Sequence, residues 1–163
     1  MKTKFVLFCL LFTALATVAH AQQNYSSAVG ARFGYPLSAS YKKFISEPGA
    51  IEAYVGLRGN TAWTWVSISA AYLHHKPLEV ENISGLNWYF GGGGSVYFWD
   101  YKFSTDIAST TLGLQGYLGL EYTFDDLPLT VSLDWVPTIF LNSYIDSFGG
   151  GYGGLGVRYI LNR

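Results

Sequence analysis

The sequence predicts an all-β protein: an eight-stranded antiparallel up-and-down transmembrane β-barrel, preceded by a cleaved signal peptide. Three observations lead to this fold class. The chain of 163 residues is only 13 % charged, but it is 18 % aromatic and contains 19 glycines. Beyond its N-terminal segment it has no apolar run of about 18 residues, the length that suggests a membrane-spanning helix. Much of the remaining chain alternates apolar and polar residues with the period of two that is typical of strands.

Residues 1–21 are predicted to be a secretory signal peptide. A positively charged start is followed by an apolar run, and the small-residue cleavage site Ala19-His20-Ala21 precedes Gln22. Cleavage there leaves residues 22–163 as one barrel domain. Cys9 leaves with the peptide, so we expect the exported domain to fold without a disulfide.

The alternation itself defines the strands. From Leu112 to Phe124 the even residues are apolar or glycine, while the odd residues include Gln115 and Glu121. This run is about twice as long as a common soluble strand of about 5–6 residues. It fits a tilted strand of about 10 residues that crosses a membrane. Eight such segments are predicted, at 25–35, 37–45, 50–58, 62–74, 85–99, 109–124, 128–140 and 149–161.

Turn-forming residues separate these segments. Four of the five prolines lie in the breaks, and Pro137 is the exception. We expect Pro137 near a rim of the barrel, where a lost ladder hydrogen bond does less harm. If the N-terminus lies in the periplasm, strand alternation fixes the side of each connection. The outer connections then fall near 36, 59–61, 100–108 and 141–148, and the inner ones near 46–49, 75–84 and 125–127.

The positions of the charges indicate which face of the strands meets lipid. Six charged residues fall on the polar faces: Arg32, Glu52, Arg58, Glu121, Asp134 and Arg158. An Arg or Lys facing lipid at the bilayer centre would cost about 2–4 kcal/mol, whereas opposite charges can pair in the lumen. The lumen of an eight-stranded barrel is just wide enough for side chains to fill. We therefore predict a structural charge network in a filled lumen, not a general diffusion pore.

Aromatic residues on the opposite faces are predicted to mark the membrane interfaces. Trp88 and Phe98 would lie about 25 Å apart along the membrane normal, the height of the apolar band. The run Gly91–Gly94 between them places two glycines on each face, leaving lumen room opposite a large group such as Tyr117 or Arg58. The interface aromatics predicted in this way are Trp88, Phe98, Tyr122, Phe124, Trp135 and Tyr159.

Trp63 and Trp65 fit the alternation less simply. They share a face with polar serines, whereas the opposite face of the same segment carries Val66 and Ile68. Either the two tryptophans point into the mouth of the lumen, or a bulge near residue 65 switches the register.

No motif in the chain predicts a catalytic, cofactor-binding or metal-binding residue. Residues 149–154 contain a G-x-G-x-x-G pattern, but a strand-like segment follows where a nucleotide site needs a helix. His74 and His75 are neighbours in a strand and point to opposite faces, so they cannot grip one metal together. We expect both histidines at a rim.

Three stretches resemble a known family: "GLNWYFGGGG" (85–94), "LGLEYTFDDLPLTVSLDWVP" (118–137) and the closing "GGLGVRYIL" (153–161). The chain resembles the small outer-membrane β-barrels of diderm bacteria, of the OmpA/OmpX and porin-family type, and within them an uncharacterised subgroup. The resemblance implies membrane insertion, no cofactor and no catalytic residues. The last strand of such barrels usually carries an assembly signal with an aromatic near the C-terminus. Here Tyr159 is the nearest aromatic, and Asn162 and Arg163 follow it.

The function expected from the sequence is therefore that of a non-enzymatic outer-membrane protein with a structural or surface-interaction role. Its expected partners are outer-membrane lipid and lipopolysaccharide, the outer-membrane assembly machinery and periplasmic chaperones. We expect a monomer that does not bind nucleic acid.

Two alternatives remain open. One is a soluble lipocalin-like barrel that binds an apolar ligand. The other is a barrel-wall lipid acyl hydrolase, because Ser67 and Ser69 share a face with His75, and Glu79 follows.

Overall fold

The computed structural model describes residues 25–80, 83–101, 110–141 and 148–163. The predicted signal peptide and most of the connections predicted at 100–108 and 141–148 lie outside these residues. The strands are β1 (Ser27–Tyr35), β2 (Leu37–Ser46), β3 (Gly49–Gly59), β4 (Trp63–Pro77), β5 (Leu86–Tyr101), β6 (Thr110–Thr123), β7 (Leu129–Trp135), β8 (Thr138–Phe140), β9 (Phe148–Gly149) and β10 (Gly153–Asn162). In this described part of the chain, no helix is long and apolar enough to cross a membrane.

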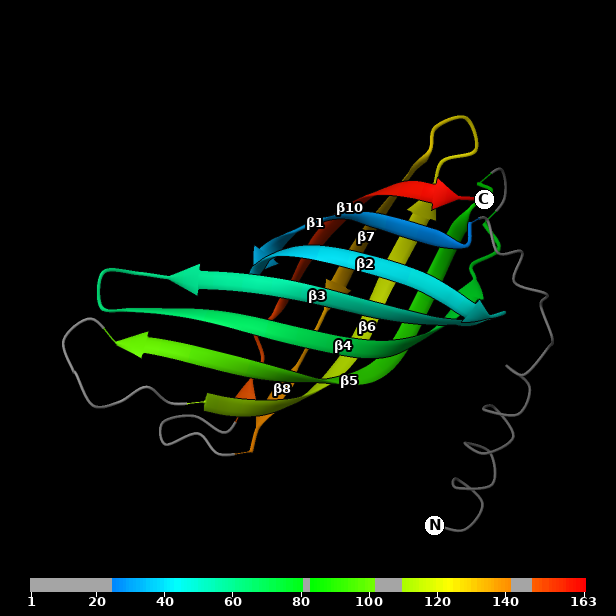
Figure 1. The fold of residues 1–163 in the computed structure, drawn as a ribbon. Coiled ribbons are helices and arrows are strands. Elements are labelled where there is room, and N and C mark those ends of the chain that lie inside the picture. Colours follow the sequence, from blue (N-terminus) through cyan, green and yellow to red (C-terminus); the bar gives the residue numbers. More distant parts are fainter. Residues whose placement is uncertain (1–24, 81–82, 102–109, 142–147) are drawn as a thin grey trace, which may run out of the picture.

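All the strands pair antiparallel in one closed sheet (Figure 1). From β1 to β7 each strand pairs with the next one in sequence, β10 follows β7, and the β1–β10 pair closes the circle. β8 continues β7 along β6, and β9 precedes β10 after a short break. The ten segments therefore form eight barrel strands. This confirms the predicted eight-stranded antiparallel barrel.

The two ends of the barrel differ in shape. β1 begins and β10 ends at the same end, where Ser27 lies opposite Asn162; we call this end the termini side. The other end, the far side, carries the tight β1–β2 turn at Pro36. The β3–β4 hairpin and the end of β5 project beyond that turn (Figure 1). Successive connections alternate between the two ends, as predicted.

Pro137 lies at the break between β7 and β8. Its carbonyl accepts a hydrogen bond from the backbone N–H of Gly116 at 2.9 Å, so the side facing β6 keeps its pairing. On the other side, Trp135 pairs with Gly153 but Thr138 pairs with Gly149. One extra residue is thus inserted between β9 and β10. This bulge interrupts the ladder opposite Pro137, where proline has no N–H to donate.

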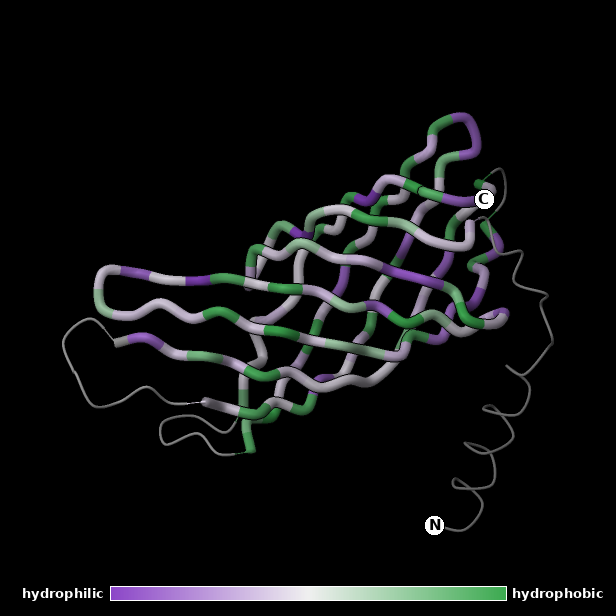
Figure 2. Tube along the Cα trace, viewed as in Figure 1, coloured by the Kyte–Doolittle hydropathy of each residue, from purple (hydrophilic) through white to green (hydrophobic). Residues whose placement is uncertain are grey.

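Outward and inward residues alternate along the strands, and Figure 2 shows the matching alternation of apolar and polar residues. The pairing of β4 with β5 is unbroken through both tryptophans, and its pairing with β3 is unbroken through Trp65. Trp65 is therefore turned into the lumen, where it is buried, and Trp63 lies half-buried at the far-side mouth. Of the two possibilities for this segment, the lumen mouth is correct and no bulge is present.

Candidate functional site

The outward face of the barrel is a continuous apolar surface. Large apolar side chains are exposed on it at every level, from Phe33 (54 %) on β1 to Leu133 (61 %) on β7. Soluble monomers rarely expose apolar patches of more than a few hundred Å². The outward charges of the described strands are few, and they lie near strand ends. A surface of this kind is suited to contact with lipid.

The six predicted interface aromatics all lie on this outward surface. Trp88, Tyr122, Phe124 and Tyr159 lie toward the termini side, and the rings of Tyr122 and Phe124 contact each other with centroids 4.8 Å apart. Phe98 (48 % exposed) and Trp135 (51 %) lie toward the far side. The Trp135 indole also donates a hydrogen bond to the carbonyl of Gly150, at 2.7 Å, which ties β7 to the bulge.

Inside the barrel, a cluster of buried charges occupies the termini-side half of the lumen. We define this charged cluster as three cations and three carboxylates, each contributed by a different strand: Arg32, Lys42, Glu52, Glu121, Asp134 and Arg158. Formally their charges cancel. Buried charges are tolerated when they are paired and hydrogen-bonded.

Glu52 on β3 lies at the centre of one half of the charged cluster. One of its carboxylate oxygens accepts hydrogen bonds from both Arg32, at 3.3 Å, and Arg158. Arg158 is fully buried and also donates to the hydroxyls of Ser132 and Ser40, at 2.8 and 3.1 Å. This single guanidinium therefore connects β10 to β7, β2 and β3.

Asp134 on β7 takes part in the same half. It accepts a hydrogen bond from Arg32 at 2.7 Å and another from the hydroxyl of Tyr89 at 2.7 Å. Arg32 thus bridges two carboxylates, one on β3 and one on β7, across the lumen.

Glu121 on β6 is the centre of the other half. It accepts a hydrogen bond from Lys42 at 2.6 Å and one from the Tyr25 hydroxyl at 2.9 Å. The Lys42 Nζ also lies 2.8 Å from His75 Nε2. Because a lysine ammonium can only donate, this imidazole nitrogen accepts. Tyr25 then packs edge-on against Phe44 near the termini-side mouth.

The charged cluster differs from the predicted charge network at two residues. Arg58 was placed in the charge network, and this is wrong: it is exposed at the far side, with its guanidinium 4.4 Å from the centroid of the Tyr35 ring. Its face was predicted correctly, but its level in the barrel puts it beyond the pairing of β2 with β3. Lys42 was missed, although it shares the inward face of β2 with Ser38 and Ser40.

His75 also departs from its expected rim position. It is buried, with 3 % of its surface exposed, whereas His74 faces outward against the Phe90 ring. β4 continues to Pro77, and this extra length carries His75 inside the barrel.

The far-side half of the lumen is filled by aromatic side chains instead of charges. We define this aromatic plug by its buried rings and the partly buried rings packed on them: Tyr35, Trp63, Trp65, Tyr97, Trp99, Phe140 and Tyr152. The Trp65 ring is central, with centroid distances of 5.0 Å to Tyr97 and 6.4 Å to Tyr152. Among the described residues, the Trp65 indole nitrogen has no hydrogen-bond partner.

Tyr54, Tyr117 and Gln115 connect the two halves. The hydroxyls of the two tyrosines lie 2.7 Å apart, and Tyr117 donates to the Gln115 side chain at 2.8 Å. A small cavity between Arg32, Tyr54 and the plug encloses about 10 Å³, room for about one water. Among the described residues, side chains therefore fill both halves of the lumen and the region that joins them.

The four consecutive glycines of β5 divide by face. Gly91 pairs with Tyr117, one of the two large residues that the sequence suggested would lie opposite the glycines. A β-carbon on Gly93 would lie 2.3 Å from the Ala70 carbonyl oxygen, and one on Gly91 would clash with β4 in the same way. The inward glycines are thus required by close approach of the β4 backbone, not by lumen volume as expected. Outward Gly92 and Gly94 have no such contact: their nearest atoms lie 3.7 and 3.6 Å away.

The described residues do not form a catalytic arrangement. Ser69 and Ser67 lie six and eight positions from His75 on one straight strand, roughly 20 and 26 Å away, so neither can transfer a proton to it. No group of three potential metal ligands occurs among the described residues. The G-x-G-x-x-G pattern forms the bulge between β9 and β10 and is followed by a strand.

Comparison with known proteins supports the architecture. No family model and no curated protein matches the chain. The crystal structure of Neisserial surface protein A, an outer-membrane eight-stranded barrel, is similar with a TM-score of 0.54. The match covers 83 % of this chain and 93 % of that chain at 13 % sequence identity. An identity this low shows a shared fold alone, and the subgroup expected from the sequence stays a prediction.

Proposed function

We propose that this chain is an integral outer-membrane β-barrel without enzymatic activity, with a structural or surface-interaction role. The observation that carries the proposal is the distribution of polarity. A closed barrel presents apolar side chains around its outside and confines its buried charges to a filled lumen. The similarity to an outer-membrane barrel supports the same location.

In this proposal the chain is exported through a cleaved signal peptide. The termini side faces the periplasm, and the far side faces the cell exterior. Its folding partners are periplasmic chaperones and the outer-membrane assembly machinery, its surroundings are lipid and lipopolysaccharide, and it acts as a monomer. The two levels of outward aromatics, including Trp88 and Trp135, mark the membrane interfaces.

The alternative functions have weaker support. A lipocalin-like barrel needs an internal ligand cavity and a polar exterior, whereas here the interior is packed and the exterior is apolar. An acyl hydrolase needs a serine within reach of its histidine, which the strand positions of Ser67, Ser69 and His75 do not provide.

A matched pair of leucine substitutions tests membrane insertion. Leu133→Arg places a charge on the mid-level outward face, whereas Leu78→Arg places the same charge in the connection after β4; both leucines are exposed, at 61 % and 39 %. An arginine at the bilayer centre costs about 2–4 kcal/mol and much less near an interface. We expect only Leu133→Arg to reduce the heat-modifiable, membrane-extracted form on a denaturing gel. A soluble barrel would tolerate both changes and would be recovered in the periplasm.

A further inference from the structure

The outward surface carries basic side chains at one end only. Lys43 on β2 and Lys76 on β4 face outward near the termini side, and His74 faces outward between them in level. On the far-side half of the described strands, no lysine, arginine or histidine faces the lipid surface. Arg58 also lies at the far side, but it is at the rim, over the Tyr35 ring, and does not face outward from the wall. The barrel wall is therefore electrically asymmetric along its axis.

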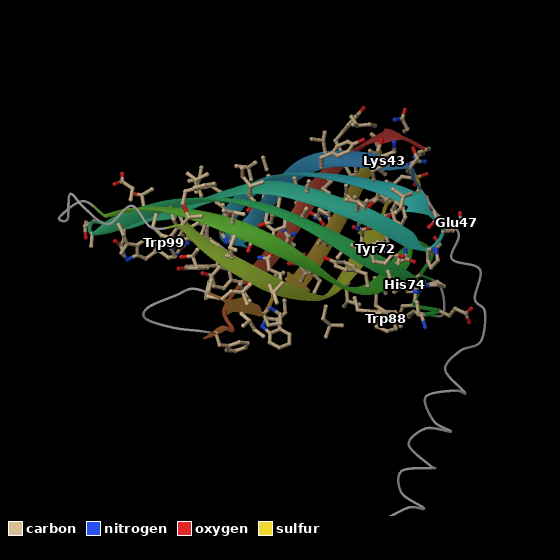
Figure 3. The ribbon with its side chains drawn as sticks, turned by 60° about the horizontal axis from the view of Figure 1, so that its bottom comes forward. Lys43, Glu47, Tyr72, His74, Trp88 and Trp99 are labelled. Carbon is tan, nitrogen blue, oxygen red and sulfur yellow. The ribbon has the colours of Figure 1, made fainter. Side chains whose placement is uncertain are left out.

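These cations and two aromatic residues form a diagonal patch across β2, β4 and β5. Lys43 lies at the level of Tyr72, and His74 and the Lys76–Trp88 pair lie successively nearer the strand ends. We call this patch the basic row: Lys43, Tyr72, His74, Lys76 and Trp88. Figure 3 shows four of them, Lys43, Tyr72, His74 and Trp88, along the same end of the barrel, with Trp99 at the opposite end. The Lys76 ammonium lies 6.0 Å from the centroid of the Trp88 ring. Trp88 thus provides an apolar face and an indole donor beside a cation, as interfacial tryptophans do.

Gly49 opens a space within the basic row. It pairs with His74, and it carries no side chain between β2 and β4. The Tyr72 phenol lies across it, with its hydroxyl 2.5 Å from the place where a β-carbon would sit. A hydroxyl donor is thereby held in the gap between Lys43 and His74. The nearby acidic residues Glu47 and Glu79 belong to the connections beyond the strand ends, on the water side of the row.

A strip of the outward wall that carries no large side chains continues from the basic row toward the middle of the barrel. It is formed by small outward residues in two neighbouring rows of the sheet, which we call the glycine strip: Ala53, Ala70, Gly92, Gly94 and Gly116. Tyr72 pairs directly with Gly92, so the strip and the row are continuous. Packing does not demand glycine here, because a β-carbon at Gly92, Gly94 or Gly116 would find its nearest atom 3.7, 3.6 or 3.5 Å away.

We propose that the basic row and the glycine strip together bind one anionic phospholipid. Its phosphate lies among Lys43, Lys76 and His74, where the Tyr72 hydroxyl donates, and one acyl chain lies on the strip. Two features point to this ligand: three outward cations near one end of the barrel, and an adjoining strip of small apolar residues. The inference rests on the proposed membrane function, because only an inserted barrel presents this wall to lipid.

The test compares lipid retention by the full mature chain. The protein is folded into vesicles of phosphatidylcholine containing a minority of phosphatidylglycerol, extracted in mild detergent, and its co-purified lipid is quantified by mass spectrometry. We expect phosphatidylglycerol to be enriched over its share of the vesicle. Replacing both lysines, Lys43→Gln with Lys76→Gln, should reduce the enrichment by about five-fold for each lysine.

Matched controls distinguish binding at this site from a non-specific effect of net charge and from non-specific contact of the wall with lipid. Lys102→Gln removes the same charge elsewhere in the chain and should leave the enrichment unchanged. Gly94→Leu should displace the acyl chain and reduce retention, whereas Val96→Leu, on the same face of β5, should not.

Two negative results have different meanings. Folding in phosphatidylcholine vesicles without enrichment of phosphatidylglycerol, or an equal loss in Lys102→Gln, would overturn this inference and leave the proposed membrane function intact. Failure of the unmodified chain to insert into vesicles of either composition would overturn both.

Discussion

The two halves of the lumen are filled by opposite means on the same strands. The charged cluster on the termini side joins its members through oriented hydrogen bonds, and its carboxylates each serve more than one partner. The aromatic plug on the far side is held by ring contacts, and its central indole nitrogen has no hydrogen-bond partner in the part of the chain that the structure describes. The difference teaches that volume alone does not describe this interior. The charged half should tolerate no loss of a partner, whereas the aromatic half should tolerate a change of ring.

Glu52→Gln should break the charged half with the largest effect. The substitution keeps the shape of the side chain but removes the negative charge that both Arg32 and Arg158 use. Loss of one partner from a buried ion pair costs about 3–5 kcal/mol. The free energy of unfolding in urea, followed through the heat-modifiable gel shift, measures this loss. Glu79→Gln, on an exposed connection, is the control and should change it by about 0.5 kcal/mol or less. Equally small effects of Glu52→Gln and Glu79→Gln would show that the ion pairs of Glu52 do not stabilise the barrel.

Gly93→Ala tests the wall that both halves share. The added methyl would meet the β4 backbone, so we expect destabilisation of about 1–3 kcal/mol, as for overpacking of a core. Gly94→Ala is the matched outward change on the next residue, where a β-carbon has room. It should be neutral or stabilise the barrel by about 0.5–1 kcal/mol. If both variants behave alike, the close approach of β4 and β5 does not explain the inward glycines.

Trp65→Phe should affect the aromatic half only mildly. It removes ring volume but no hydrogen bond to any described residue, since none of these pairs with the indole nitrogen. We expect a loss of about 1–2 kcal/mol, in the range of conservative core changes, clearly smaller than that of Glu52→Gln. The same unfolding measurement decides the order. A larger loss for Trp65→Phe than for Glu52→Gln would reverse the comparison between the two halves.

Arg58→Gln should have the smallest effect. This residue lies outside the charged cluster, and its guanidinium lies over the face of Tyr35, so a loss of about 0.5 kcal/mol is expected for an exposed cation–π contact. A loss as large as that of Glu52→Gln would restore Arg58 to the network in which the sequence had placed it.

Much of the fold could be predicted from the sequence because alternation with a period of two records which face each residue occupies. The eight segments, the closed antiparallel barrel and the inward face of most charges follow from it. Level along the barrel does not, since it depends on strand tilt and on the register between strands. Arg58 was misplaced for this reason. His75 was misplaced because β4 runs three residues beyond the predicted segment.

Lys42 shows a different limit. It stands beside Lys43, and adjacent lysines commonly indicate an exposed, solvated stretch. The alternation Ser38, Ser40, Lys42 was present in the sequence and would have assigned it to the lumen. Its partner Glu121, however, comes from a strand 79 residues away, and no local pattern reports a contact over that separation.

Arg158 has a consequence for how the barrel assembles. It belongs to β10, the last strand, yet its hydrogen-bond acceptors come from β2, β3 and β7, and it also lies 3.8 Å from Glu121 on β6. Until the last strand meets the first, Glu52 lacks one of its two counter-charges and the lumen carries a net negative charge. Neutrality of the interior and closure of the sheet are therefore reached in the same step. An open chain would leave this charge unbalanced, and closure of the barrel by β10 restores the balance.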